Sequence, residues 1–129
     1  MSSLFTRIIA REIPAEILLE DDRYLAFLDI RPVAAGHTLV IPKQAHDYIF
    51  TLDDDILSGL LPFAKRVVPA IENSVDCKRI GVMVAGLEVP HTHIHLIPIN
   101  SVHDLSFALA KPAAPEALAA LAKTIRTHL

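Results

Sequence analysis

Cysteine is almost missing from this sequence, and so are long apolar runs and any excess of basic residues. Cys77 is the only cysteine, so no intrachain disulfide can form and we expect a protein of the reducing cytoplasm. No stretch approaches the roughly 18 apolar residues of a membrane span, and the first residues lack the apolar run of a signal peptide, so we expect no membrane partner. The formal net charge of −3 provides no positive field for nucleic acid, which we do not expect as a partner either.

Apolar residues, in contrast, make up 52% of the chain, and its mean hydropathy is positive. A length of 129 residues suits one domain, predicted to span residues 1–129, with a sizeable core. Because this apolar fraction is high for a small monomer, it indicates additional burial in an oligomer.

The most unusual feature of the sequence is a run of histidines at every second position: His91, His93 and His95. Side chains alternate along a strand, so on a strand the three rings would line one face, whereas on a helix they would scatter. The intervening β-branched and apolar residues also favour a strand. A row of imidazoles on a buried strand is costly to maintain unless it has a use.

The remaining sequence predicts helices and strands in the order helix, hairpin, strand, helix, hairpin, helix. The predicted strands are Glu16–Glu20, Tyr24–Ile30, His37–Ile41, Lys78–Ala85 and His91–Ile99. The predicted helices begin at Ser2 or Ser3, at a capping box over Thr51–Asp54, and at Pro115. The second of these contains Pro62 and Pro69, and we expect one kinked helix, with two shorter helices as the alternative. Gly36 is expected to adopt an unusual backbone angle. This order predicts an α+β fold, in which helices pack on a five-stranded antiparallel sheet.

Three uses of the histidine row compete. The first is a metal site, because His-x-His on a strand is a common zinc-ligand spacing. Alternate residues lie about 6.6 Å apart and the outer two about 13 Å apart, so two histidines, not three, can share one zinc ion. The remaining ligands would have to come from His37, His46, Glu88 or His103. The second use is structural, with neutral histidines hydrogen-bonded in a core.

The third use is nucleophilic catalysis. A neutral imidazole nitrogen attacks phosphorus well and then leaves well, which splits one difficult displacement into two easier ones. Neighbouring rings on the same face can donate hydrogen bonds to the phosphate oxygens. This chemistry requires no metal and no other cofactor.

The run from His91 to Ile97 resembles the histidine-triad motif of the histidine triad (HIT) superfamily. Three further blocks, Phe5–Pro14, Glu20–Ile30 and Gly36–Lys43, are similar to those of its nucleotide-binding branch, and the resemblance covers residues 4–99. It implies a five-stranded α+β unit that forms a homodimer with a continuous ten-stranded sheet. It also implies a purine nucleotide as ligand and cleavage at its α-phosphate.

The resemblance assigns roles residue by residue. His93 would be the nucleophile that forms a nucleotidyl-histidine intermediate, His95 would contact the phosphate, and His91 would orient the strand. His37 would lie beside the nucleophile, and Asp29 would accept hydrogen bonds from the ribose hydroxyls. The positions that match the base pocket are Leu4, Phe5, Ile8, Phe27 and Ile30.

The turn before the triad departs from the family pattern. Leu87 stands where glutamine is expected, and Glu88 stands where a hydroxyl residue is expected beside the phosphate. A carboxylate there repels a phosphate by roughly 1 kcal/mol at 4 Å in water. Glu88 stands at a nucleotide-binding position of the family, where it would point away from the phosphate, act as a proton donor or restrict the substrate; the alternative is a solvated turn residue. The alternative function of the protein is a non-catalytic nucleotide-binding module. The zinc site that some relatives carry is not expected, because no Cys-x-x-Cys lies near Phe5.

Overall fold

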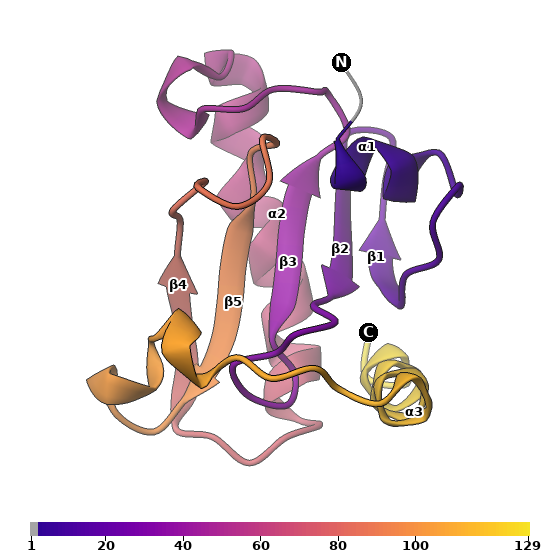
Figure 1. The fold of residues 1–129 in the computed structure, drawn as a ribbon, viewed down its shortest axis with the longest axis vertical. Coiled ribbons are helices and arrows are strands. Elements are labelled where there is room, and N and C mark those ends of the chain that lie inside the picture. The colour runs from indigo at the N-terminus through magenta and orange to yellow at the C-terminus, as the bar shows by residue number, and fades with distance from the viewer. Residues whose placement is uncertain (1–2) are drawn as a thin grey trace.

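The computed structural model describes residues 3–129 and is shown as a ribbon in Figure 1. The helices are α1 (Leu4–Ile9), α2 (Asp54–Glu72) and α3 (Pro115–Arg126), and the strands are β1 (Ile17–Glu20), β2 (Tyr24–Leu28), β3 (Thr38–Pro42), β4 (Arg79–Met83) and β5 (Ile94–Ile99). Short 3-10 turns cover Ile49–Thr51, Val102–Asp104 and Phe107–Leu109. Within residues 3–129, no helix combines the length and the apolar character that crossing a membrane requires.

The five strands form one antiparallel sheet in the order β1-β2-β3-β5-β4. The predicted α+β fold is therefore confirmed. In the centre of the sheet, Phe27 pairs with Leu39 and Leu39 with His95. This register places the residues that flank β2 and β3 beside the histidine run of β5.

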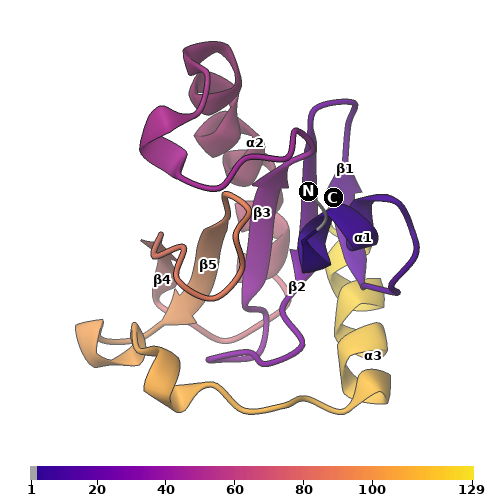
Figure 2. The ribbon, with the colours of Figure 1, turned by 45° about the horizontal axis from the view of Figure 1, so that its top comes forward.

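The two faces of the sheet carry different helices, as Figure 2 shows. On one face, α2 and α3 pack over the larger core, to which alternate strand residues such as Ala26, Val40 and Leu96 contribute. On the other face, α1 packs over Phe27, Leu39 and neighbouring residues. The α1 face is less covered, and the histidines lie on this side.

Helix α1 begins at the predicted cap. Ser3 accepts a hydrogen bond from the backbone N–H of Thr6 (3.2 Å), and the Thr6 hydroxyl accepts one from the N–H of Ser3 (2.6 Å). The alternative cap, Ser2, lies outside the described residues. With only six residues, α1 depends on packing for its stability, and Phe5 and Ile8 provide it by burying their side chains against the sheet.

Helix α2 is a single helix of 19 residues rather than two shorter helices, but its predicted cap is wrong. Asp53 is the cap, and its carboxylate accepts from the N–H of Asp55 (3.3 Å). Thr51 belongs instead to a 3-10 turn, where its hydroxyl donates to the carbonyl of Tyr48. Two prolines inside the helix, at positions 62 and 69, are exposed, so the carbonyl groups that they leave without a donor face water.

Gly36 adopts a φ of +96°, which confirms the prediction of an unusual backbone angle. A Cβ atom at this position would lie 3.2–3.3 Å from side-chain atoms of Pro98, Ile71 and Val75. Both the angle and the close packing require glycine. The turn at Gly36 leads directly into His37, whose N–H donates to the carbonyl of Ala34 (3.0 Å).

Candidate active site

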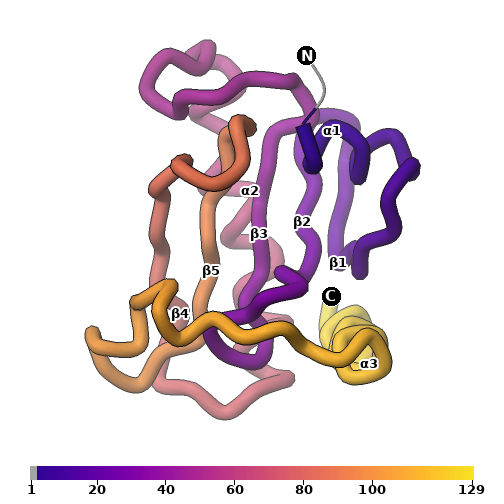
Figure 3. The backbone as a smooth tube through the Cα atoms, viewed as in Figure 1, coloured from indigo at the N-terminus to yellow at the C-terminus, as the bar shows by residue number. Residues whose placement is uncertain are grey.

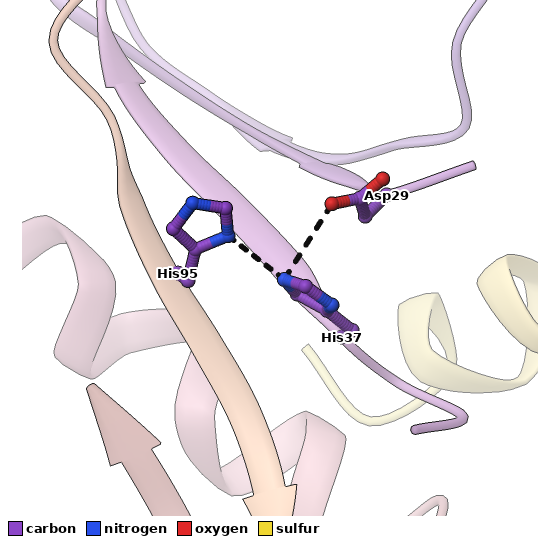
Figure 4. A group of neighbouring side chains, drawn as sticks. All are labelled: Asp29, His37 and His95. Atoms are coloured by element: carbon purple, nitrogen blue, oxygen red, sulfur yellow. Dashed lines mark hydrogen bonds and ion pairs between the residues drawn. The ribbon is translucent and has the colours of Figure 1, made fainter. Parts of the chain in front are cut away.

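Two residues that flank the connection between β2 and β3 meet a histidine of β5 on the α1 face of the sheet. Asp29 follows β2 and His37 precedes β3, and the N–H of Asp29 donates to the carbonyl of His37 (3.0 Å). The Nε2 atom of His37 lies 2.9 Å from Nδ1 of His95 and 3.5 Å from Oδ2 of Asp29. Figure 4 shows the three side chains converging from three different segments of the chain.

The predicted strand His91–Ile99 is too long at its beginning. His91 and His93 precede β5, which begins at Ile94. The reason is that Thr92 bonds to the connection before α2 rather than to a strand. The N–H of Thr92 donates to the carbonyl of His46 (2.6 Å), and its hydroxyl donates to the carbonyl of Asp47 (3.0 Å).

The histidine rings nevertheless stay together. The His93 ring lies 4.9 Å from that of His95 and 5.1 Å from that of Phe5, measured between ring centroids. His91 is 1% exposed, lies 6.0 Å from Phe5 and donates from Nε2 to the carbonyl of Pro42 (2.8 Å). Its Nδ1 atom is buried and has no hydrogen-bond partner among the described residues.

A backbone carbonyl fixes the tautomer of His93. Its Nδ1 lies 2.6 Å from the carbonyl oxygen of His91, and since a carbonyl can only accept, Nδ1 must carry the proton. The neutral ring then has its free lone pair at Nε2. This is the state that a nucleophilic imidazole requires.

A second chain of hydrogen bonds fixes the tautomer of His95. The N–H of Val33 donates to Nδ1 of His37 (2.9 Å), so the neutral His37 ring must carry its proton at Nε2. That proton is donated to Nδ1 of His95, whose own proton must then be at Nε2. His95 is thereby prepared as a hydrogen-bond donor, which suits contact with a phosphate oxygen.

Burial keeps the rings of His37 and His95 neutral. Burial, with a smaller contribution from the nearby His93, lowers the pKa of His37 to about 4 and that of His95 to about 3. The pKa of His91 is also lowered by burial, although the bond to the carbonyl of Pro42 acts against this. Burial raises the pKa of Asp29. At neutral pH, His37 and His95 therefore act through hydrogen bonds rather than positive charge.

These shifts predict that the protein loses stability in mild acid. Between the unfolded pKa of about 6.5 and the folded values, the unfolded chain binds more protons, so the free energy of unfolding falls as the pH falls. We expect a decrease of about 1.4 kcal/mol per pH unit for each of His37 and His95. Urea unfolding from pH 7.5 to about 5 measures this slope over a range in which carboxyl groups with ordinary pKa values stay largely ionised.

The matched variants are His37→Gln, which should reduce the slope by the contribution of that one ring, about 1.4 kcal/mol per pH unit, and His128→Ala, an exposed histidine whose removal should leave the slope unchanged. A free energy of unfolding that stays constant from pH 6.5 to pH 5 would show that the buried rings do not control acid stability.

A cavity of about 290 Å³ lies beside these rings. All of the residues predicted for the site line it except His91, namely Leu4, Phe5, Ile8, Phe27, Asp29, Ile30, His37, Glu88, His93 and His95. The structure thus brings together residues from four separate parts of the chain. His91 lies behind the cavity wall, where it holds the backbone at Pro42.

Phe107 also lines the cavity, which the sequence did not predict. Its ring centroid lies 4.7 Å from that of His95. This residue belongs to the segment 100–114, which we call the strap; in Figure 3 it runs from the end of β5 across the sheet to α3. Backbone bonds from Lys111 to Pro32 (3.2 Å) and from Ala113 to Ile30 (3.1 Å) tie the strap to the loop that follows Asp29. Arg31 and Val89 are further lining residues that were not predicted.

Residues 3–129 contain one group of side chains that could bind a metal ion, formed by Asp29, His37 and His95. Their ligand atoms lie within 4.8 Å of one another. The two ring nitrogens are 2.9 Å apart and share a proton. A zinc ion bound to both at about 2.1 Å would have an N–Zn–N angle of about 90°, well below the tetrahedral value of about 109°. This geometry suits a hydrogen-bonded pair rather than a zinc site.

Comparison with known proteins agrees with this combination of fold and site. The family described as the HIT domain matches residues 10–102, and the chain belongs to this family. It is 36% identical to the adenosine 5′-monophosphoramidase hnt1 of Schizosaccharomyces pombe, over all of this chain and 99% of that protein.

Solved structures show the same likeness. A Hit-like protein involved in cell-cycle regulation from Bartonella henselae has a TM-score of 0.87 at 31% identity, covering 99% of this chain and 96% of that one. A hypothetical histidine triad nucleotide-binding protein from Sulfolobus tokodaii has a TM-score of 0.84 at 32% identity, covering 95% and 89%. The suspected family, including its nucleotide-binding branch, is confirmed.

Proposed function

We propose that the protein is a cytoplasmic nucleoside phosphoramidase, which binds a purine nucleotide conjugate and cleaves it at the α-phosphate through His93. The observation that carries this proposal is the free lone pair at Nε2 of His93, in a ring that lines the cavity and whose proton is held by the carbonyl of His91. The similarity to an adenosine 5′-monophosphoramidase supports the same reaction.

The reaction proceeds in two displacements. Nε2 of His93 attacks phosphorus as the P–N bond to the leaving amine breaks, and the amine takes up a proton from solvent at the cavity mouth. Water then attacks the phosphorus of the resulting nucleotidyl-histidine and loses a proton to solvent, while the P–N bond to Nε2 breaks, returns its electrons to Nε2 and releases the nucleoside monophosphate. In both steps, the N–H at Nε2 of His95 stabilises charge on a phosphate oxygen.

The rest of the cavity suits the nucleoside. Asp29 lines the cavity, and a carboxylate accepts two hydrogen bonds and therefore fits the paired hydroxyls of ribose. The apolar residues Leu4, Phe5, Ile8, Phe27 and Ile30 line the part proposed for the purine base. Ile30 is 62% exposed and Leu4 is 44% exposed, so these two lie where a base would cover them.

The test uses adenosine 5′-monophosphoramidate and its 2′-deoxy analogue. We expect the wild-type protein to cleave the ribose compound about ten- to a hundredfold more efficiently, because the deoxy compound offers Asp29 one hydroxyl fewer. Asp29→Asn should reduce kcat/KM for the ribose compound and bring the two substrates close together, as measured by release of AMP or dAMP.

A wild-type protein that cleaves neither compound would overturn the proposed activity. If it bound AMP without cleaving any phosphoramidate, the non-catalytic nucleotide-binding module would be favoured instead. The observation on the side of that alternative is Glu88, an acidic residue that lines the same cavity in which the phosphate must bind.

We also propose that the protein is a homodimer joined along β4. This strand lies at an edge of the sheet, and a second copy paired to it would extend the sheet to ten strands. Apolar side chains are exposed on and after β4, among them Val82 (50%), Val84 (44%) and Leu87 (94%). Covering them would account for the high apolar fraction of the chain.

Sedimentation equilibrium should give twice the 14.1 kDa of the chain. Val82→Glu should shift the protein towards the monomer, because the substitution places a charge at the proposed contact. Leu129→Glu, at the opposite end of the sheet beside α3, should leave the mass unchanged. A wild-type mass of one chain at micromolar concentration would contradict the dimer.

A further inference from the structure

Phe107 stands near the middle of the strap, between two places where the strap is attached to the rest of the protein (Figure 3). Before it in the chain, the side chain of Leu105 packs over Gly81 of β4, so closely that a Cβ atom at position 81 would lie 2.8 Å from Cδ2 of Leu105. After it, two backbone hydrogen bonds of 3.1 and 3.2 Å tie the strap to the loop that follows Asp29. The backbone around Phe107 is therefore held from both directions along the chain.

The ring of His95 lies among three other rings. Its centroid is 5.2 Å from that of His37, 4.9 Å from that of His93 and 4.7 Å from that of Phe107. His37 and His93 have hydrogen-bonding nitrogens and proposed roles in the reaction, whereas the phenyl ring of Phe107 has no hydrogen-bonding group. Phe107 can therefore act on His95 in two ways, by restricting the movement of its ring and by excluding water from it.

The proposed role of His95 depends on both effects. The torsion that turns a histidine ring has broad minima, so one hydrogen bond at Nδ1 does not by itself fix the direction of the N–H at Nε2. The bond between His37 and His95 also joins two buried rings, which are 1% and 5% exposed. Water that reached this bond would compete for both nitrogens, and hydrogen bonds are stronger where water is excluded.

We propose that Phe107 is a positioning residue, which holds the His95 ring in the orientation that directs its N–H at the phosphate and keeps water away from the hydrogen bond between His37 and His95. The inference rests on the proposed phosphoramidase function, because the phosphate gives this orientation its use. Phe107 acts through His95 and touches no reacting atom. A donor to the transition state loses much of its effect when it is misdirected by a fraction of an ångström or by a changed angle.

Kinetics of adenosine 5′-monophosphoramidate cleavage test the proposal. We expect Phe107→Ala to lower kcat by roughly ten- to thirtyfold and to change KM by less than about threefold, since the lost alignment matters mainly in the transition state. Phe107→Leu keeps apolar bulk beside His95, so its kcat should remain within about threefold of the wild type. The matched control is Leu109→Ala, which removes an apolar side chain from the same 3-10 turn but outside the cavity and should leave both constants unchanged.

The hydrogen bond itself provides a readout that does not depend on activity. The proton shared by His37 and His95 should give a downfield imidazole N–H resonance in the wild-type protein, assigned by its absence in His37→Gln. In Phe107→Ala, entry of water should broaden this resonance through exchange with solvent. The resonance should persist in Phe107→Leu and in Leu109→Ala.

Three results would overturn the role of Phe107: an unchanged kcat with an unchanged resonance in Phe107→Ala, an increase in KM alone, which would mark a contact with the nucleotide, or an equal loss of kcat in Leu109→Ala. Failure of the phosphoramidase proposal would look different. In that case, the wild-type protein would cleave no phosphoramidate, while the resonance would still be lost in Phe107→Ala and kept in Phe107→Leu, so that the protection of His95 by Phe107 would stand.

Discussion

His93→Ala is expected to lower kcat for adenosine 5′-monophosphoramidate by at least about 10³-fold, because no other side chain can replace the covalent step. The hydrogen bond from Nδ1 of His93 to the carbonyl of His91 leaves the lone pair of His93 free at Nε2. The neighbouring histidine rings cannot take over this role. His95 has its free nitrogen occupied by His37, and His91 does not line the cavity. The measurement is the initial rate of AMP release at saturating substrate.

The matched control is His128→Ala, which removes an exposed histidine at the end of α3 and should leave kcat unchanged. Affinity for AMP, measured by calorimetry, should remain within a few fold in His93→Ala and shows that the cavity still forms. Retention of more than a tenth of the wild-type kcat would exclude His93 as the nucleophile.

The second large effect is expected at His37, which contacts no reacting atom and acts by positioning the proton of His95. His37→Leu removes both the acceptor for the N–H of Val33 and the donor to Nδ1 of His95. The His95 ring is then free to carry its proton at the wrong nitrogen. We expect kcat to fall by roughly a hundredfold, since a preorganised donor to the transition state is lost.

His37→Gln separates this role from simple packing. The carboxamide oxygen of glutamine can accept from Val33 and its NH₂ group can donate to His95, so kcat should remain within about tenfold of the wild type. Nitrogen-15 shifts of the His95 ring report directly which nitrogen carries the proton, and they should differ between the two variants. Equal losses of activity in the leucine and glutamine variants would argue against a tautomer relay.

Much of this site could be predicted from the sequence because its residues follow the regular spacing of strands and helices. The two-residue spacing expected of a strand places the rings of His93 and His95 on one side, and they lie together although β5 begins only at Ile94. Asp29 and His37 flank neighbouring strands, so antiparallel pairing brings them together in space. The apolar residues of α1 follow from a helical pattern with a clear cap at Ser3.

Other features depend on tertiary contacts that leave no local pattern. The beginning of β5 is set by the bonds of Thr92 to the distant connection before α2. The position of Phe107 is set by the backbone bonds of the strap to Ile30 and Pro32, within a stretch that has no periodicity. A capping box at Thr51 has the expected spacing, but the 3-10 turn engages this hydroxyl and Asp53 caps the helix instead.

The strap has a consequence for the synthesis of this protein. The proposed nucleophile, ribose acid and base pocket are all encoded before residue 96, yet the ring that lies beside His95 belongs to Phe107, and the bond that ties the strap to Ile30 comes from Ala113. A nascent chain therefore carries every proposed catalytic group before it can complete the cavity wall. The cavity proposed for the nucleotide is therefore complete only after the strap has emerged from the ribosome and docked on the loop behind Asp29.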